Sequence, residues 1–298
     1  MTLADPAVIT CAISGALADR SRCPAIPYTP AEYAAEARRA VDEGAVHIHI
    51  HARRPDGTPS VAADDFVAIR DAIVAEVGEA AIINFSTGTV GVSVAERVAY
   101  LEAGRPEVAA LNMGSLNYAK YSRSRRAFVF DFVFANPFGE IIELLEAMRR
   151  LGIKPEHECF DLGHVASLEP LVDMGLLESP LHADFIMGVL GGAPATARNL
   201  AAMADNMPVV GGGGREQIRN HWGVIGIGRE QWAMIAAALS LGGSVRAGLE
   251  DNFYLPDGTM ARSNGELIAK ARQMAEDAGR RPASVAEARA LLGIATPA

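Results

Sequence analysis

Three histidines at alternating positions are the most chemically suggestive feature of the sequence. His47, His49 and His51 lie in the segment VHIHIHARRPDG, and the chain has seven histidines in all. Side chains two residues apart on a β-strand share a face, so the three imidazoles would point the same way. Two neighbouring imidazoles in an aliphatic strand are costly to bury without a partner. We therefore favour a metal site, with core histidines hydrogen-bonded to the backbone as the alternative.

Only two of the three histidines can bind the same ion. Neighbouring same-face positions are about 6.6 Å apart and the outer two about 13 Å, whereas a zinc–histidine bond measures about 2.1 Å. In barrels of parallel strands, chemistry takes place at the carboxyl ends of the strands. This rule selects His49 and His51 as ligands and assigns His47 to a deeper layer.

A third ligand is available near the other end of the chain. In the segment SVRAGLEDN, Arg246, Gly248 and Glu250 share one strand face, and Glu250 and Asp251 fall where the strand ends. Adjacent carboxylates usually mark a solvated turn. An eighth strand of a closed barrel, however, lies near the first two, so Glu250 could reach an ion held by the histidines. Three protein ligands suit catalytic zinc, and a 2-His-1-carboxylate set also suits non-haem iron.

The elements that would position these residues alternate along the whole chain. Short apolar runs are each followed by a helical pattern, a rhythm typical of parallel sheets. Eight such strands predict an α/β fold, a (β/α)8 TIM barrel, with an open doubly wound sheet as the alternative. The predicted strands are residues 8–13, 46–50, 80–85, 108–113, 157–162, 182–190, 222–227 and 244–249.

The sequence also indicates where several helices begin and end. Thr29 is expected as an N-cap with Pro30 in the first turn, and Gly44 is expected to close that helix. Residues 263–294 predict a C-terminal helical extension of two amphipathic helices, the second begun by a capping box of Ser284 and Glu287. We expect one TIM-barrel catalytic domain over residues 1–298.

Two segments interrupt the alternation. Residues 117–136 are longer than the connection after the fourth strand requires, and are expected to form a lid or a subunit contact. Residues 207–221 contain four consecutive glycines, Gly211 to Gly214. This run lacks the Gly-Lys-Ser/Thr ending of a phosphate-binding loop, so we expect a flexible loop.

Composition limits the class of protein. With 36 acidic and 27 basic residues, the net charge is −9, which argues against nucleic acid or an anionic membrane as a partner. The three cysteines are widely spaced and indicate neither a disulfide framework nor a cysteine zinc site. The N-terminal segment does not resemble a signal peptide, and a cytoplasmic location is expected.

Several motifs of the chain resemble those of one known family. The segments HIHARRPDGTPS, INFSTG, PEVAALNMGSLNY, GIGR and VRAGLEDN resemble those of the β-keto acid cleavage enzymes, and the similarity runs from Ile9 to Leu292. The resemblance implies a zinc-containing TIM barrel, usually a homotetramer. It also implies an acyl exchange in which a β-keto acid and acetyl-CoA give acetoacetate and a new acyl-CoA.

The resemblance also assigns roles to individual residues. The family's zinc ligands fall on the three positions already selected, and its Arg and Asp dyad falls on Arg246 and Asp251. Zinc would stabilise an enolate as a Lewis acid, Asp251 would be the base, and Arg246 would orient the Asp251 carboxylate. The alternative for this Arg–Asp pair is a structural salt bridge. The expected substrate or cofactor contacts are Glu158 and a Ser-Thr-Gly turn of Ser86, Thr87 and Gly88. Ser86 is also a candidate donor to the oxyanion. The alternative for Ser86 is an ordinary helix cap.

The sequence also offers candidates for the residues that contact coenzyme A and the tail of the substrate. Arg229, beside Gly226 and Gly228, is a candidate for the CoA phosphates, because loops after strands seven and eight of TIM barrels often bind phosphate. Leu17 and Ala110 replace polar family residues and favour an aliphatic tail, whereas Glu158 leaves a cationic, dehydrocarnitine-like substrate open. The alternatives to the acyl exchange are a metal hydrolase, a non-haem iron oxygenase, and a non-catalytic barrel that binds metal or acyl-CoA.

Overall fold

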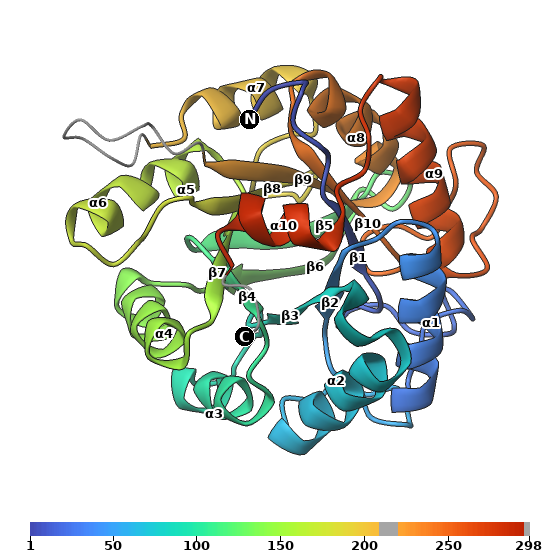
Figure 1. The fold of residues 1–298 in the computed structure, drawn as a ribbon, viewed down its shortest axis with the longest axis horizontal. Helices are drawn as coiled ribbons and strands as arrows, with labels where there is room; N and C mark the ends of the chain where they lie inside the picture. The colour runs from blue at the N-terminus through green and yellow to red at the C-terminus, as the bar shows by residue number, and fades with distance from the viewer. Residues whose placement is uncertain (209–219, 295–298) are drawn as a thin grey trace.

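Eight parallel strands close into a barrel in the computed structural model, which describes residues 1–208 and 220–294 (Figure 1). The order around the barrel is β1-β10-β9-β8-β7-β4-β3-β2, and β1 pairs with both β2 and β10. The predicted TIM barrel is therefore confirmed. The strands are β1 (Ile9–Ala12), β2 (His47–Ile50), β3 (Ile82–Ser86), β4 (Val108–Asn112), β7 (Lys154–Cys159), β8 (His182–Met187), β9 (His221–Gly226) and β10 (Ser244–Ala247).

Helices surround the barrel and bury the outer faces of its strands. Ile48 and Ile50 of β2, for example, are fully buried in the main hydrophobic cluster, while the alternate positions are occupied by histidines. The helices are α1 (Pro30–Asp42), α2 (Ala63–Val77), α3 (Val94–Gly104), α4 (Phe138–Leu151), α5 (Leu162–Ala166), α6 (Leu168–Asp173), α7 (Ala197–Asp205), α8 (Gln231–Ser240), α9 (Asn264–Asp277) and α10 (Val285–Leu292), with 3-10 turns η1 (Gly78–Ala80) and η2 (Gly228–Glu230).

The predicted helix boundaries are largely confirmed. Thr29 caps α1 in a capping box with Glu32, and Pro30 is the first helical residue. Ser284 and Glu287 form the expected capping box of α10. The first helix ends at Asp42, and Gly44 follows with a φ of 107°, a conformation that favours glycine.

The two ends of the barrel are covered differently. Helix α10 lies across the end where the strands begin (Figure 1), and its Ala288 and Leu292 pack on Val8, Val46 and Ile82. A hairpin of β5 (Leu116–Ser122) and β6 (Ala127–Phe134), which accounts for most of the segment 117–136, covers part of the opposite end. Helix α10 therefore closes the end where the strands begin, and the end where they finish is only partly covered.

Some local predictions differ from the structure. The fifth barrel strand, predicted at residues 157–162, is β7 at Lys154–Cys159. The prediction starts too late because Lys154, Pro155 and Glu156 do not resemble residues of a core strand. The Gly211 to Gly214 run lies outside the described residues. Within the described ranges, no helix is both long and apolar enough to span a bilayer.

Candidate metal centre and active site

Side chains from the second and last barrel strands meet at the mouth of the barrel. The Nε2 atoms of His49 and His51 lie 3.7 and 3.5 Å from Oε1 of Glu250, and the two imidazole centroids are 5.4 Å apart. The three donor atoms fall within 4.8 Å of one another. The structure therefore brings together the three residues that strand geometry selects from the sequence.

The backbone around the first strand holds this trio in place. Glu250 donates its backbone N–H to the Ala12 carbonyl (3.2 Å), and the Tyr33 hydroxyl donates to the His51 carbonyl (2.7 Å). Gly15, with a φ of 60°, lies directly against Glu250: a Cβ at this position would stand 2.7 Å from the Glu250 Cγ. The close approach of the loop after β1 therefore requires glycine.

Arg246 organises the carboxylates on the other side of the trio. Its Nε and Nη2 donate to the two oxygens of Asp251, each at 2.9 Å, and Nη2 also donates to Glu250 Oε1 at 2.6 Å. A longer ion pair of 3.5 Å joins Nη1 to Glu158. One buried guanidinium thus fixes the positions of three acidic groups, which rigidly orients Asp251.

Burial and charge shift the protonation of these groups in different directions. Burial and Arg246 hold the pKa of His49 well below its usual range, so the imidazole is neutral. Burial alone would raise the pKa of Glu250, but Arg246 and His51 outweigh it and keep that pKa well below the usual range. For Asp251 and Glu158, burial outweighs Arg246 and raises the pKa to about 6 and about 7. A neutral imidazole and an ionised carboxylate are the forms that bind metal.

Of these residues, all but the buried His49 line a cavity of about 580 Å³ at the barrel mouth. Ser86 and Gly88 lie on its wall with His51, Glu250 and Asp251. Much of the remaining wall is apolar and comes from the hairpin and the ends of β7, β8 and β9: Tyr118, Phe132, Phe134, Phe160, Ile186, Val189, Ile225 and Ile227. The arrangement combines a polar floor with an apolar side.

The polar floor fits a metal ion. Both ring nitrogens of His49 and the Oε2 atom of Glu250 are buried without a hydrogen-bond partner in the described part of the chain. Unpaired buried polar atoms are rare, and a cation would satisfy one of the His49 nitrogens and the Glu250 carboxylate. Two imidazoles and one carboxylate are a zinc donor set that leaves a coordination position free.

Comparison with known proteins gives the family. The chain matches the family described as beta-keto acid cleavage enzyme over residues 6–294. It belongs to that family. A 3-keto-5-aminohexanoate cleavage enzyme of Acetoanaerobium sticklandii is 36% identical over 96% of this chain and 98% of the relative. A 3,5-dioxohexanoate:acetyl-CoA acetone transferase of Paraburkholderia graminis is 34% identical over 96% and 94%. The resemblance seen in the motifs is thus confirmed.

Solved structures support the architecture. The binary complex of ObcA with oxaloacetate superposes with a TM-score of 0.75, covering 92% of this chain and 68% of that chain at 20% identity. At that identity the likeness concerns the fold alone. It agrees with the closed barrel.

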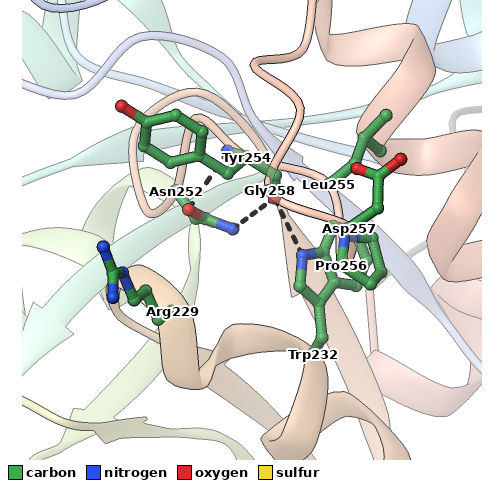
Figure 2. Close-up of a pocket in the computed structure, with 8 residues that line it drawn as sticks. All are labelled: Arg229, Trp232, Asn252, Tyr254, Leu255, Pro256, Asp257 and Gly258. Carbon is green, nitrogen blue, oxygen red and sulfur yellow. Dashed lines mark hydrogen bonds between the residues drawn. The ribbon is translucent and has the colours of Figure 1, made fainter.

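Two residues expected in the family's site lie elsewhere. Thr87 is buried, and its hydroxyl donates to the Ala110 carbonyl, so neither residue lines the cavity. Arg229 lines a separate pocket of about 450 Å³ with Trp232, Asn252 and Tyr254 (Figure 2). The two sites adjoin, because Asn252 follows Asp251 and the Gly228 N–H donates to the Asp251 carbonyl (2.8 Å).

Sequence reasoning missed a polar layer below the trio. His47 lies there, as expected, but with Glu156, His182, Asp184 and His221, which the sequence analysis does not select. The available signal was alternation: Glu156 and Glu158 are two residues apart on one strand, and so are His182 and Asp184. The barrel interior is polar, in contrast to the apolar strands assumed from the sequence.

Proposed function

We propose that this chain is a zinc-dependent β-keto acid cleavage enzyme, which condenses a β-keto acid with acetyl-CoA to give acetoacetate and a new acyl-CoA. The observation that carries the proposal is the convergence of His49, His51 and Glu250 beside the Arg246–Asp251 pair, where all of these residues but His49 line one cavity. Membership of the family supports the reaction class. We further propose one catalytic domain over residues 1–298, a homotetramer and a cytoplasmic location.

The trio would hold the zinc ion. When bound, zinc would supply Lewis-acid stabilisation of the enolate formed from the β-keto acid. His49 and His51 would contribute ring nitrogens, and Glu250 would contribute a carboxylate whose other contact is Arg246. Zinc and Arg246 together would offset the negative charges of Glu250, Asp251 and Glu158, so the site would admit a carboxylate-bearing substrate.

Asp251 is the base in this proposal. It would take a proton from the carbon between the ketone and carboxylate groups of the substrate, and the resulting enolate carbon would attack the thioester carbonyl of acetyl-CoA. Arg246 holds both Asp251 oxygens and keeps the carboxylate aimed into the cavity. Ser86, on the cavity wall, would donate its hydroxyl to the substrate carboxylate or to the oxyanion formed on the thioester. This attack would expel the CoA thiolate, which would add to the original ketone carbonyl of the adduct. Breaking the bond between that carbonyl carbon and the α-carbon would release the new acyl-CoA and the enolate of acetoacetate, which would take back the proton held by Asp251.

The CoA nucleotide would bind beside this cavity. Figure 2 shows Arg229 and Trp232 opposite the loop that carries Asn252, Tyr254 and Gly258. The loop is held by the Trp232 indole N–H, which donates to the Tyr254 carbonyl at 2.8 Å, and by Asn252, whose amide donates to the same carbonyl at 2.7 Å. A fixed pocket with one guanidinium and two aromatic rings suits a phosphate-bearing nucleotide.

The cavity wall favours a substrate with an uncharged, apolar tail. Leu17 lies on the cavity wall and is 73% exposed, where a polar residue would be needed to bind an ammonium group. Glu158, the acidic residue that could attract a cation, is already paired with Arg246. Aliphatic β-keto acids therefore fit better than aminated ones or a quaternary ammonium tail.

A substrate panel tests the function. Purified protein is incubated with acetyl-CoA and aliphatic, dicarboxylic, aminated and quaternary ammonium β-keto acids, and acetoacetate is measured. We expect turnover of aliphatic members, and its loss in Glu250→Gln together with loss of zinc from this site. Turnover that persists in Glu250→Gln protein without zinc at this site would refute the proposal. Substrate-dependent oxygen uptake with stoichiometric iron would instead identify an oxygenase.

A further inference from the structure

A second set of potential metal ligands lies deeper in the barrel, outside the site described above. His47 on β2 and His182 on β8 place their Nε2 atoms 3.9 and 3.8 Å from Oε2 of Glu156 on β7. The three donor atoms lie within 4.8 Å of one another, and all three side chains are buried. Asp184 lies beside this set, and its Oδ2 is in hydrogen-bond contact with His182 Nε2 at 3.1 Å.

The surrounding groups orient these donors. Thr10 Oγ1 lies 3.0 Å from Nδ1 of His47, which leaves Nε2 directed at Glu156. The Asn84 side-chain amide donates to Glu156 Oε2 at 2.6 Å. Metal-binding histidines and carboxylates in proteins are commonly held by such outer hydrogen bonds. The geometry is therefore that of oriented ligands.

The protein itself satisfies this cluster only in part: Glu156 Oε2 accepts from Asn84 and His182 Nε2 contacts Asp184 Oδ2, but other polar atoms of the cluster have no partner. Nε2 of His47, Oε1 of Glu156 and Nδ1 of His182 are buried without a hydrogen-bond partner in the described ranges. Among the same residues, the groups within ion-pair distance of Glu156 and Asp184 are histidines only. The nearest guanidinium, that of Arg246, is engaged by the carboxylates of the upper site. Two buried carboxylates without a matching cation are energetically unfavourable.

We propose that His47, Glu156 and His182 form a second divalent-metal site of the zinc class, structural rather than catalytic. With two separations of 3.9 and 3.8 Å and none above 4.8 Å, a point equidistant from the three donor atoms is within about 2.5 Å of each, so small inward shifts would give zinc bonds of about 2.0–2.2 Å. The upper trio has similar dimensions. All three side chains of the lower set are buried, so no substrate would reach the ion, which favours a structural role. The ion would tie β2, β7 and β8 together across the barrel.

Metal stoichiometry tests this site. Chelator-treated protein is reloaded with zinc, excess metal is removed, and zinc per chain is measured by mass spectrometry. We expect two ions in the wild type and one in Glu156→Gln and in His182→Asn, which preserve side-chain volume approximately. His157→Asn is the matched control: His157 is an equally buried histidine on the opposite face of β7, and its loss leaves two ions. Glu250→Gln, which removes an upper ligand, leaves one.

Diffraction from wild-type crystals at the zinc edge makes the test independent of how the variants fold. We expect two anomalous peaks, one at each cluster. A single ion per chain at the upper trio, with Glu156→Gln unchanged, would overturn the second site. The inference does not rest on the proposed reaction: failure of acetoacetate formation with two bound ions would reject the function alone.

Discussion

At the scale of single residues, a substitution of Asp251 tests whether the Arg246–Asp251 pair is catalytic or structural. Because Arg246 binds both its oxygens, a salt bridge that merely stabilises the barrel is the competing explanation. Asp251→Asn keeps the shape and removes the base. We expect kcat to fall roughly 10²- to 10⁴-fold, with zinc content unchanged, since general-base catalysis contributes about that much. The control is Asp277→Asn at an exposed position. Full activity in Asp251→Asn would assign the pair a structural role.

Gly15 is the second residue that can be tested sharply. A methyl group there would stand 2.7 Å from the Glu250 Cγ, so Gly15→Ala should displace the carboxylate and weaken zinc binding at least tenfold. Gly91 is a matched control: its φ is 73°, similar to the 60° of Gly15, but nothing lies within 4 Å of its added Cβ. Both variants bear the same backbone strain, so a competition assay with a chromogenic chelator isolates the displacement. Equal affinities in the two variants would contradict the packing argument.

The sequence predicts that His49, His51 and Glu250 converge, but it does not predict the lower layer, and the reason is physical. His49, His51 and Glu250 could be selected because strand period, barrel closure and the position of strand ends are general rules. Glu156 and His182 depend on which same-face residues of β2, β7 and β8 face one another at one depth, and the sequence does not give that register. Arg246 was placed by resemblance, but its simultaneous contact with three carboxylates needed coordinates.

At the scale of elements, the β5–β6 hairpin is the clearest difference from a minimal barrel. Its length was visible in the sequence, but the pairing of Leu116 with Phe134 and the packing of its aromatic residues on the ends of β7 to β9 were not. Because Tyr118, Phe132 and Phe134 line the cavity, the hairpin contributes directly to the substrate wall. Two roles were expected from its length, a lid and a subunit contact. Each would use a different face of the hairpin.

The cavity face of the hairpin predicts an effect on substrate affinity. Phe132→Ala removes an aromatic ring from the wall, so KM for a β-keto acid with an aliphatic tail should rise roughly tenfold, as expected for about 1.4 kcal/mol of lost apolar contact. Zinc content should not change. Phe138→Ala, at the exposed first residue of α4 and outside the cavity, is the control and should leave KM unaltered. A change in kcat alone, with KM constant, would place the substrate tail elsewhere.

At the scale of the whole molecule, the outer face of the same hairpin bears on assembly. Phe128, Val129 and Val133 are 58%, 48% and 61% exposed, so three large apolar side chains project from one small sheet. Contiguous exposed apolar surface is typical of contacts between subunits. This surface is the best candidate on the described residues for a contact in the proposed homotetramer.

Charge substitution on that face tests the assembly. The double variant Phe128→Glu with Val133→Glu should dissociate a tetramer to dimers or monomers, because like charges buried in a symmetric contact meet their own copies. Light scattering after size exclusion measures the mass directly. Val74→Glu on α2, where the native side chain is 44% exposed, is the control and should keep the wild-type mass. Since the cavity lies within one barrel, the dissociated form should retain its zinc; a tetramer that survives the double charge would show that another face joins the subunits.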